Sequence, residues 1–455
     1  MRFPALILLA FSTSGFGAEW LRVRTPQLEI LTDAGEKAAR ATLERLNLIR
    51  SVLATSPVSD PLPLRVFVFG SEAEFRKYSD GPVADGFYQP GVERDFIVLH
   101  AEAGLARAAI HEYVHLVLDR RTAPLPLWFE EGTAELYSNL DVRGHGMLVG
   151  EPIREKLATL TSEKWLSSRD LAAANRQSPF YNERALAGIF YAESWALVHM
   201  LNFAPGWRER MPQFAEQLAA GNADAFHAAF GKTMDQALSD LPGYASRMRG
   251  VSVDAPPRAN EPPPTVERLP SLAASLACAD LALHLQHVDL SRSLMEGAFK
   301  AQPESAQLEA GFGSIALAEG DSADARSRFE RAIVLGSRDA EVYFQLAMLE
   351  RDAGAPGSRV DALLEKTIEL DPAFGEAHFL LGLHMTDSDP ENAVQHLTAA
   401  ARASPGKSYV WHALGYAQMR LGDTGSARLS ASRALQTSAT EQEERMAKAL
   451  LDSLK

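Results

Sequence analysis

The carboxyl-terminal part of the chain repeats itself with a period of about 34 residues. Prolines stand at equivalent places at Pro303, Pro372 and Pro405, and Ser337 occupies the step between the first two. A repeat of this length is one supersecondary unit that cannot bury its apolar face alone, so several units must stack. The period therefore predicts a helical array over residues 271–440, and it constrains the fold more than any other feature.

Small residues mark the packing positions inside each unit. Because they let paired helices approach closely, larger residues can fill the gaps between them. The pattern is clearest in the last unit at Trp411, Leu414, Gly415, Tyr416 or Ala417, Gly422, Asp423, Ala427 and Ala434. An earlier unit shows it at Gly313, Gly320, Asp321, Ala325, Phe329 and Ala332, and a third at Gly382, Ala393, Leu397, Ala400 and Pro405.

This pattern resembles the tetratricopeptide-repeat family. The resemblance implies an all-α solenoid of about four units with a weaker one before them. Residues 441–455 form a charged terminal segment that is expected to cap the stack. Such a solenoid presents a groove suited to a peptide or protein partner, and a spacer without a partner is the alternative.

A short motif in the other half of the chain carries the chemistry. Residues 111–115 read His-Glu-Tyr-Val-His, and apolar residues surround them at 106–110 and 116–118. In a helix, residues i and i+4 share a face, so both imidazoles can bind one Zn²⁺. Glu112 is then placed to take a proton from water activated by the metal. The apolar flanks predict a buried helix, in which these polar side chains need the partners that a metal supplies.

A carboxylate-rich segment follows the motif. Residues 127–136 read Leu-Trp-Phe-Glu-Glu-Gly-Thr-Ala-Glu-Leu, and prolines just before them suit the start of a helix. Glu131 and Glu135 then lie on one helix face. His₂Glu with an open position is a common catalytic zinc site. The residues alone leave Glu130, Glu131 and Glu135 open as the third ligand.

The two motifs together resemble the gluzincin metallopeptidases, most closely the peptidase MA-like group found next to tetratricopeptide repeats. The resemblance implies that His111, His115 and Glu131 bind zinc, with Glu112 as the general base. It places Glu135 where thermolysin-like relatives keep a carboxylate that accepts the outer ring N–H of a histidine ligand, here His111.

The same resemblance points to a residue that stabilises the oxyanion. Related enzymes place a catalytic tyrosine on a helix at about the distance of Tyr191, within the apolar segment 189–201. A core aromatic residue with a satisfied hydroxyl is the alternative for Tyr191. His145, between two glycines, is a second candidate or a surface residue, and His199 is expected to be a core histidine.

The amino-terminal half predicts an α+β zincin-like catalytic domain over residues 19–250. By resemblance, the strand expected at 95–100 is the sheet edge that binds the substrate backbone. No G-x-M-E-N signature precedes the zinc helix, which favours an endopeptidase over an aminopeptidase. The remaining elements predicted from alternation and periodicity are strands at 19–24, 28–31 and 64–69 and a helix at 34–52.

The amino-terminal segment, the single cysteine, a proline-rich segment and the net charge complete the predicted organisation. Residues 1–18 resemble a secretory signal peptide, with no cysteine after it for a lipid anchor. The single cysteine, Cys278, excludes disulfides within the chain and fits a bacterial periplasm. Residues 251–270, rich in proline, predict an extended linker before the repeats at 271–455. The net charge of −14 argues against nucleic acid as a partner.

These features together predict an exported, zinc-dependent peptidase that hydrolyses peptide bonds. Its repeat domain would recruit a substrate or another protein. The alternative is a non-catalytic scaffold that binds peptides or proteins and carries a degenerate peptidase domain. Glu112 separates the two hypotheses, because it binds no metal and a pure scaffold has no need of it.

Overall fold

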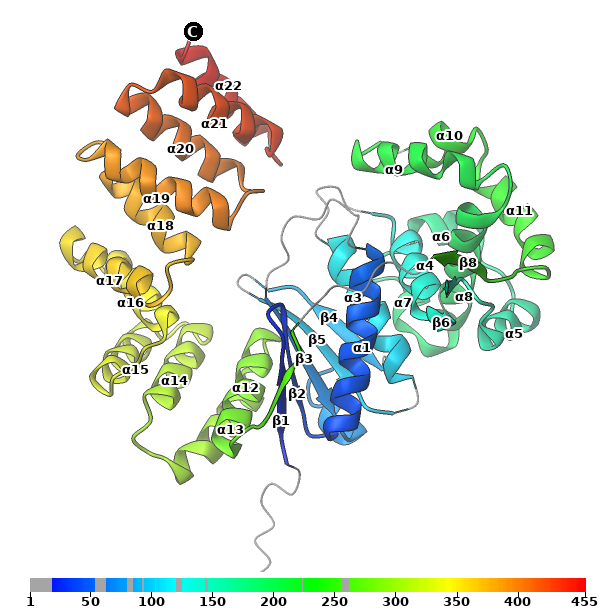
Figure 1. The fold of residues 1–455 in the computed structure, drawn as a ribbon, viewed down its shortest axis with the longest axis horizontal. Helices are drawn as coiled ribbons and strands as arrows, with labels where there is room; N and C mark the ends of the chain where they lie inside the picture. The colour runs from blue at the N-terminus through cyan, green and yellow to red at the C-terminus, as the bar shows by residue number, and fades with distance from the viewer. Residues whose placement is uncertain are drawn as a thin grey trace, which may run out of the picture. The chain divides into compact units, whose positions relative to one another are not determined.

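The computed structural model describes residues 19–53, 63–79, 85–91, 94–102, 104–119, 125–143, 146–222, 224–254 and 262–455. The predicted signal peptide at 1–18 and the candidate His145 lie outside the described residues. The chain divides into two compact units, Met1–Ala274 and Ser275–Lys455 (Figure 1). The border lies close to residue 270, where the repeats were predicted to begin.

A six-stranded mixed sheet organises the amino-terminal unit. Its strand β3 is apolar except for Arg65, as expected for a strand that is covered on both faces. β3 runs parallel to β2 and β5, whereas β4 and β9 are antiparallel edge strands. In spatial order the strands are β4 (Gly86–Gln89), β5 (Asp95–His100), β3 (Leu64–Phe69), β2 (Leu28–Thr32), β1 (Leu21–Arg24) and β9 (Thr265–Arg268).

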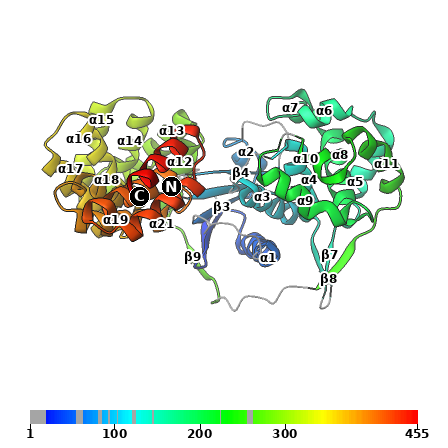
Figure 2. The ribbon, with the colours of Figure 1, turned by 90° about the horizontal axis from the view of Figure 1, so that it is seen from above.

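Helices cover both faces of this sheet. Helices α1 (Glu36–Leu53) and α3 (Leu105–Asp119) pack on one face, and the short α2 (Glu72–Phe75) lies on the other (Figure 2). The core between α1, α3 and the sheet is formed by Leu46, Ile49, Val66, Val68, Ile97, Leu99, Ile110 and Val114. These contacts hold α3 against the sheet and fix the direction of its polar side chains.

The structure corrects the prediction for residues 95–100. These residues form β5, which lies between β3 and β4 and is completely buried, so it is not the sheet edge. The edge on this side of the sheet is β4, a strand that was not predicted from the sequence. Its four residues Gly-Phe-Tyr-Gln are too few for alternation to reveal a strand.

The rest of this unit is mainly helical. Two helices form its centre, α4 (Leu127–Ser138) and α8 (Arg184–Phe203), and they share a large apolar core with the helices around them. The surrounding elements are α5 (Arg154–Ser162), α6 (Ser168–Ala173), α7 (Pro179–Asn182), η1 (Arg208–Arg210), α9 (Met211–Ala219), α10 (Ala225–Phe230) and α11 (Met234–Ala245). A second sheet contains β6 (Asp141–Arg143), β7 (Gly146–Val149) and β8 (Val251–Asp254).

The predicted linker at 251–270 is shorter in the structure. Its first residues form β8, which pairs with β7, and residues 265–268 form β9, which pairs with β1. The reason lies in short alternating runs such as Val251-Ser252-Val253, which suit a strand. Both ends of the predicted linker therefore belong to sheets of the amino-terminal unit.

The carboxyl-terminal unit is a tetratricopeptide-like helical array. Four antiparallel helix pairs follow α12 (Ser271–His284) and α13 (Val288–Ala301), and α22 (Glu441–Ser453) packs on the last pair. The pairs are α14 (Ala306–Ala318) with α15 (Ser322–Val334), α16 (Ala340–Asp352) with α17 (Gly357–Leu370), α18 (Gly375–Met385) with α19 (Pro390–Ala403), and α20 (Ser408–Leu421) with α21 (Thr424–Gln436). The predicted repeats and the terminal helix are confirmed.

Glycines explain how these pairs pack. A Cβ atom on Gly313 would lie 2.7 Å from the ring of Phe329, and one on Gly382 would lie 2.6 Å from Leu397. Gly422 ends α20 with a φ of 89°, which only glycine adopts readily.

Among the described residues, no helix has the length and apolar character needed to cross a membrane.

Candidate metal centre

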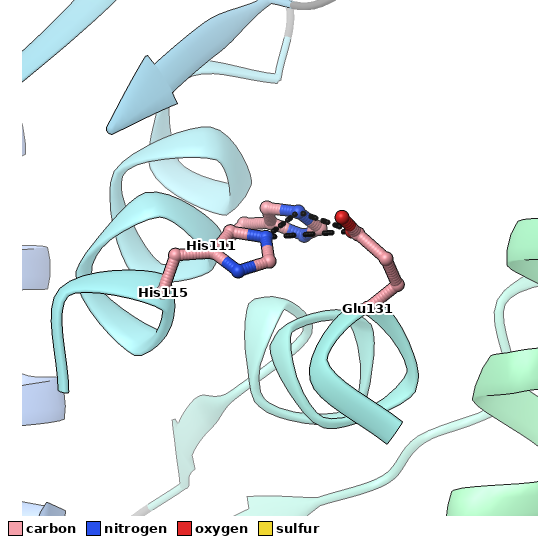
Figure 3. A group of neighbouring side chains, drawn as sticks. All are labelled: His111, His115 and Glu131. Atoms are coloured by element: carbon pink, nitrogen blue, oxygen red, sulfur yellow. Dashed lines mark hydrogen bonds and ion pairs between the residues drawn. The ribbon is translucent and has the colours of Figure 1, made fainter. Parts of the chain in front are cut away.

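The three predicted ligands converge at one point. Nε2 of His111 lies 3.0 Å from Nε2 of His115, and both nitrogens lie 3.4 Å from Oε2 of Glu131 (Figure 3). The histidines project from α3 and the glutamate from α4. In the part of the chain that the structure describes, this is the one group of three potential ligands whose atoms lie close enough for a shared ion.

The spacing of the three ligand atoms fits zinc. Nitrogen and oxygen ligands lie about 2.0–2.1 Å from Zn²⁺, so two of them at a tetrahedral angle are about 3.3 Å apart. The observed separations of 3.0, 3.4 and 3.4 Å lie close to that value. Oε2 of Glu131 is buried and makes no hydrogen bond within the described residues, which is costly for a carboxylate oxygen. A cation between the three atoms would supply the missing partner.

Close packing of two helices places Glu131. The next residue, Gly132, faces α8, and a Cβ atom there would clash with the carbonyl oxygen of Ser194, at a distance of 2.3 Å. Only glycine allows this approach, so α4 meets α8 at a fixed rotation. That rotation directs Glu131 to the imidazoles, and its side chain is only 1% exposed.

The two other candidate glutamates point elsewhere. Glu130 is in ion-pair contact with Arg176, with Oε2 and Nη2 3.4 Å apart. Oε1 of Glu135 lies 3.9 Å from Nδ1 of His111, on the outer side of that ring. Glu135 therefore occupies the place that the resemblance implied, beside the nitrogen that does not face Glu131. The distance is that of an ion pair and is longer than a hydrogen bond.

Charges set the protonation of this cluster. Burial raises the pKa of Glu131, but the positive charges of His115 and His111 outweigh burial and hold that pKa well below its usual range. Burial lowers the pKa of His111, but its contact with Glu131 and the charges of Glu112 and Glu135 raise that pKa to about 9. The carboxylates around the two imidazoles thus favour positive charge at this position.

The candidate base Glu112 is held by the edge strand. It is buried, and its carboxylate accepts a hydrogen bond from the backbone N–H of Tyr88 in β4. A Cβ atom on Gly86 would lie 3.4 Å from Cγ of Glu112, so the strand and the side chain are in close contact. Burial raises the pKa of Glu112, and the charges of His111 and His115 oppose that rise. A raised pKa suits a general base that works near neutral pH.

The Tyr88 side chain ties β4 to its surroundings. Its hydroxyl lies 3.2 Å from Oδ2 of Asp119 at the end of α3 and 3.3 Å from Oδ1 of Asp95 in β5. The strand is thereby fixed to α3 and to its neighbour in the sheet. These contacts connect the short edge strand to α3, the helix that carries Glu112.

Two tyrosines lie near the same cluster. Tyr191 of α8 and Tyr181 of α7 share a hydrogen bond, and their ring centroids are 6.1 Å apart. Burial raises the pKa of Tyr191 well above its ordinary value, and the negative charge of Glu131 raises it further. The phenol therefore stays protonated and can donate a hydrogen bond. The Tyr191 hydroxyl already shares a hydrogen bond with Tyr181, which is what the alternative of a core aromatic residue predicts, and the charges of Glu131 and Glu112 act on it.

His199 has the structural role that was predicted. It is completely buried on α8, with Nε2 2.8 Å from the carbonyl oxygen of Gly150 and Nδ1 2.6 Å from the hydroxyl of Tyr244. Nε2–H donates to the carbonyl, so Nδ1 accepts from the tyrosine. Both ring nitrogens are satisfied, and His199 is a core histidine.

Sequence reasoning missed several residues around the cluster. Tyr88 and Tyr181 belong to very short elements, so no periodicity marked them. Lys156 of α5 contacts Glu135, with Nζ and Oε1 2.9 Å apart. One lysine on a polar helix gives no signal in the sequence, because only the fold brings it to the cluster.

The solved structures that are similar to this protein cover only part of the chain. No protein-family model matches it, and no curated protein matches it. The TPR protein YrrB, whose peptide-binding site is described as unusual, is 16% identical with a TM-score of 0.32 over 38% of this chain and 90% of its own. MamA is 20% identical, with a TM-score of 0.30, over 39% of this chain and 94% of its own. A thermophilic TPR protein from Thermus thermophilus is 17% identical, with a TM-score of 0.29, over 40% of this chain and 98% of its own.

Likenesses at this level do not bear on function. The helical array described above rests on its own helix pairs, and nothing in the comparisons addresses the metal centre.

Proposed function

We propose that the protein is a zinc-dependent peptidase of the gluzincin type, and the absence of an exopeptidase signature favours an endopeptidase. The observation that carries this proposal is the convergence of His111, His115 and Glu131 around a buried carboxylate oxygen that has no hydrogen-bond partner among the described residues. When bound there, zinc would supply a Lewis acid that lowers the pKa of water towards neutrality.

The side chains around the centre have distinct tasks in this proposal. His111, His115 and Glu131 hold the ion, and Glu135 orients His111 through its outer nitrogen. Glu112 takes a proton from the attacking water and passes it to the amide nitrogen that leaves. The hydroxyl of Tyr191 donates a hydrogen bond to the oxygen that gains negative charge in the transition state.

The edge strand β4 is the proposed place for the substrate backbone. It is the outer strand of the sheet on this side and lies against Glu112. An extended peptide adds to such an edge through main-chain hydrogen bonds. This assigns to β4 the role that the sequence analysis had given to β5.

Cleavage of a mixed peptide library, followed by mass spectrometry, tests the proposal. The zinc-loaded full chain is compared with Glu112→Gln, which should retain zinc and lose cleavage by at least about 10³-fold, since removal of a general base at this step is severe. Cuts inside peptides would identify an endopeptidase. Equal cleavage by the variant would reject Glu112 as the base, and a wild-type protein without bound zinc would reject the metal centre.

The helical array supports a second candidate function. Stacked helix pairs present an extended surface to a peptide or a protein, so the chain could act as a binding scaffold without turnover. Zinc retained without any cleavage in the library experiment would favour this function. The two functions are compatible, because the array can deliver a substrate to the metal centre.

The proposed peptidase would act outside the cytoplasm, most simply in a bacterial periplasm. The support is the signal-like composition of residues 1–18 together with a single cysteine in the chain. Amino-terminal sequencing of the exported protein tests this assignment, and a retained Met1 would contradict cleavage.

A further inference from the structure

A lysine outside the predicted site joins three helices behind the metal centre. Nζ of Lys156 on α5 lies 2.9 Å from Oε1 of Glu135 on α4, and 5.5 Å from the ring centroid of Tyr191 on α8. The Lys156 side chain is 14% exposed and that of Glu135 is 12% exposed. The contact is therefore largely shielded from water, where a charge pair is stronger than at the surface.

The oxygen that Lys156 contacts is the one that faces the metal centre. Oε1 of Glu135 lies 3.9 Å from Nδ1 of His111, whereas Oε2 faces Nη2 of Arg107 at 3.5 Å. Arg107 is the more exposed cation of the two, with 42% of its side chain accessible. Lys156 is thus the nearer and better buried partner, and it contacts the carboxylate oxygen that lies on the His111 side of Glu135.

The positive charge of Lys156 also compensates the negative charge of Glu135. Glu135 lies in a region that also contains Glu112 and Glu131, and a carboxylate among like charges would otherwise turn towards water. The ammonium group opposes that movement. Its contact with the Tyr191 ring anchors it on a third helix, so the position of Glu135 is coupled to the packing of α5 against α8.

We propose that Lys156 is a positioning residue for the metal centre, acting through Glu135 to orient His111. The proposal rests on the proposed zinc site. Partners that orient a histidine ligand typically contribute 10–100-fold to metal affinity, which sets the effect expected from loss of the lysine at about 10-fold.

Zinc affinity of the full chain, measured by competition with a chromophoric chelator, tests the role without using activity. Lys156→Met should weaken zinc binding about 10-fold, and Lys156→Arg should restore most of the affinity. Glu135→Gln combined with Lys156→Met should bind zinc no more weakly than Glu135→Gln alone, because both changes remove the same interaction. Lys164→Met, at an exposed position, is the matched control and should leave the affinity unchanged.

Each outcome decides a different question. Wild-type affinity in Lys156→Met overturns the positioning role alone, and additive effects in the double variant overturn its action through Glu135. A wild-type chain that binds no zinc overturns the proposed function, and the positioning role with it. Should Lys156→Met fail to fold, Lys156→Gln replaces it and removes the ammonium charge: weaker zinc binding supports the positioning role, and wild-type affinity overturns it.

Discussion

Two buried glutamates, one in each unit, show how a structural carboxylate differs from a carboxylate in the candidate metal centre. Glu309 in α14 is 3% exposed, and Arg328 and Arg331 satisfy its oxygens at 3.0 and 2.9 Å. Glu131 in α4 is equally buried, but its Oε2 faces two imidazoles at 3.4 Å without a hydrogen bond among the described residues. A buried carboxylate with complete partners stabilises its fold, whereas an incomplete set leaves an oxygen that can accept a further partner, which at Glu131 is the zinc ion that we propose.

Glu193 of α8 is an intermediate case. Its Oε1 accepts the backbone N–H of Leu166 at 2.7 Å, and its Oε2 has no hydrogen-bond partner among the described residues. Burial raises the pKa of Glu193 to about 7, and the hydrogen bond from Leu166 opposes that rise only in part. Three buried glutamates thus differ in how completely they are paired, and substitution of each by glutamine tests the comparison.

The largest expected effect is the loss of zinc affinity when Glu131 is replaced. Glu131→Gln should weaken zinc binding by at least about 100-fold, because loss of a ligand exceeds the 10–100-fold typical of partners that only orient ligands. Metal content after dialysis and chelator competition measure the effect. Glu130→Gln, at the neighbouring residue paired with Arg176, is the matched control. Unchanged affinity in Glu131→Gln, with a loss in Glu130→Gln, would reverse the assignment of the ligand.

Substitution of Glu193 is expected to change the free energy of unfolding in a pH-dependent way. Its pKa is about 7 in the folded chain against an ordinary 4.5, so the folded state binds the extra proton between these values. The contribution of Glu193 to the free energy of unfolding therefore falls as pH rises from about 4.5 to about 7, and it is constant above that range. Glu193→Gln removes this loss and should stabilise the amino-terminal unit on the order of 2 kcal/mol at pH 8, with little effect at pH 4.5.

Urea unfolding followed by tryptophan fluorescence measures this effect. Five of the six tryptophans lie in the amino-terminal unit, namely Trp20, Trp128, Trp165, Trp195 and Trp207, so the signal reports mainly on that unit. Equal stabilisation of the variant at both pH values would contradict the raised pKa, since a pure packing effect does not depend on protonation.

The smallest effect is expected at Glu309. Glu309→Gln should destabilise the helical array by about 1 kcal/mol, because both arginines are partly exposed and can turn to water after the carboxylate is lost. Helical circular dichroism during urea unfolding measures it. Glu319→Gln, which breaks an exposed pair with Arg292, is the control and should change stability less. Zinc affinity should be unchanged in both variants, in contrast to Glu131→Gln.

Local structure accounts for what could be predicted well. Each helix pair of the array forms within about 34 residues, so period and small residues such as Gly313 and Gly382 were sufficient. The spacing of His111 and His115 is set by one helix, and their shared face follows from that spacing alone. The strands β1, β2 and β3 were likewise visible as apolar or alternating runs.

Contacts between distant segments account for what could not be predicted. The edge position of β4 depends on the order in which strands pair, and its four residues carry too little pattern. The proline-rich segment looked like a linker, yet residues 251–254 and 265–268 pair with strands far away in the sequence. Lys156 reaches Glu135 only because α5 packs near α4 and α8.

The sequence by itself determined that the chain has a helical array and a helix with two histidines on one face, because both follow from the geometry of single helices and adjacent helix pairs. Only the tertiary structure decided which carboxylate meets those histidines. Glu130, Glu131 and Glu135 share one helix, and the contact between Gly132 and Ser194 fixes its rotation. That rotation turns Glu131 to the imidazoles, Glu130 to Arg176 and Glu135 to Lys156.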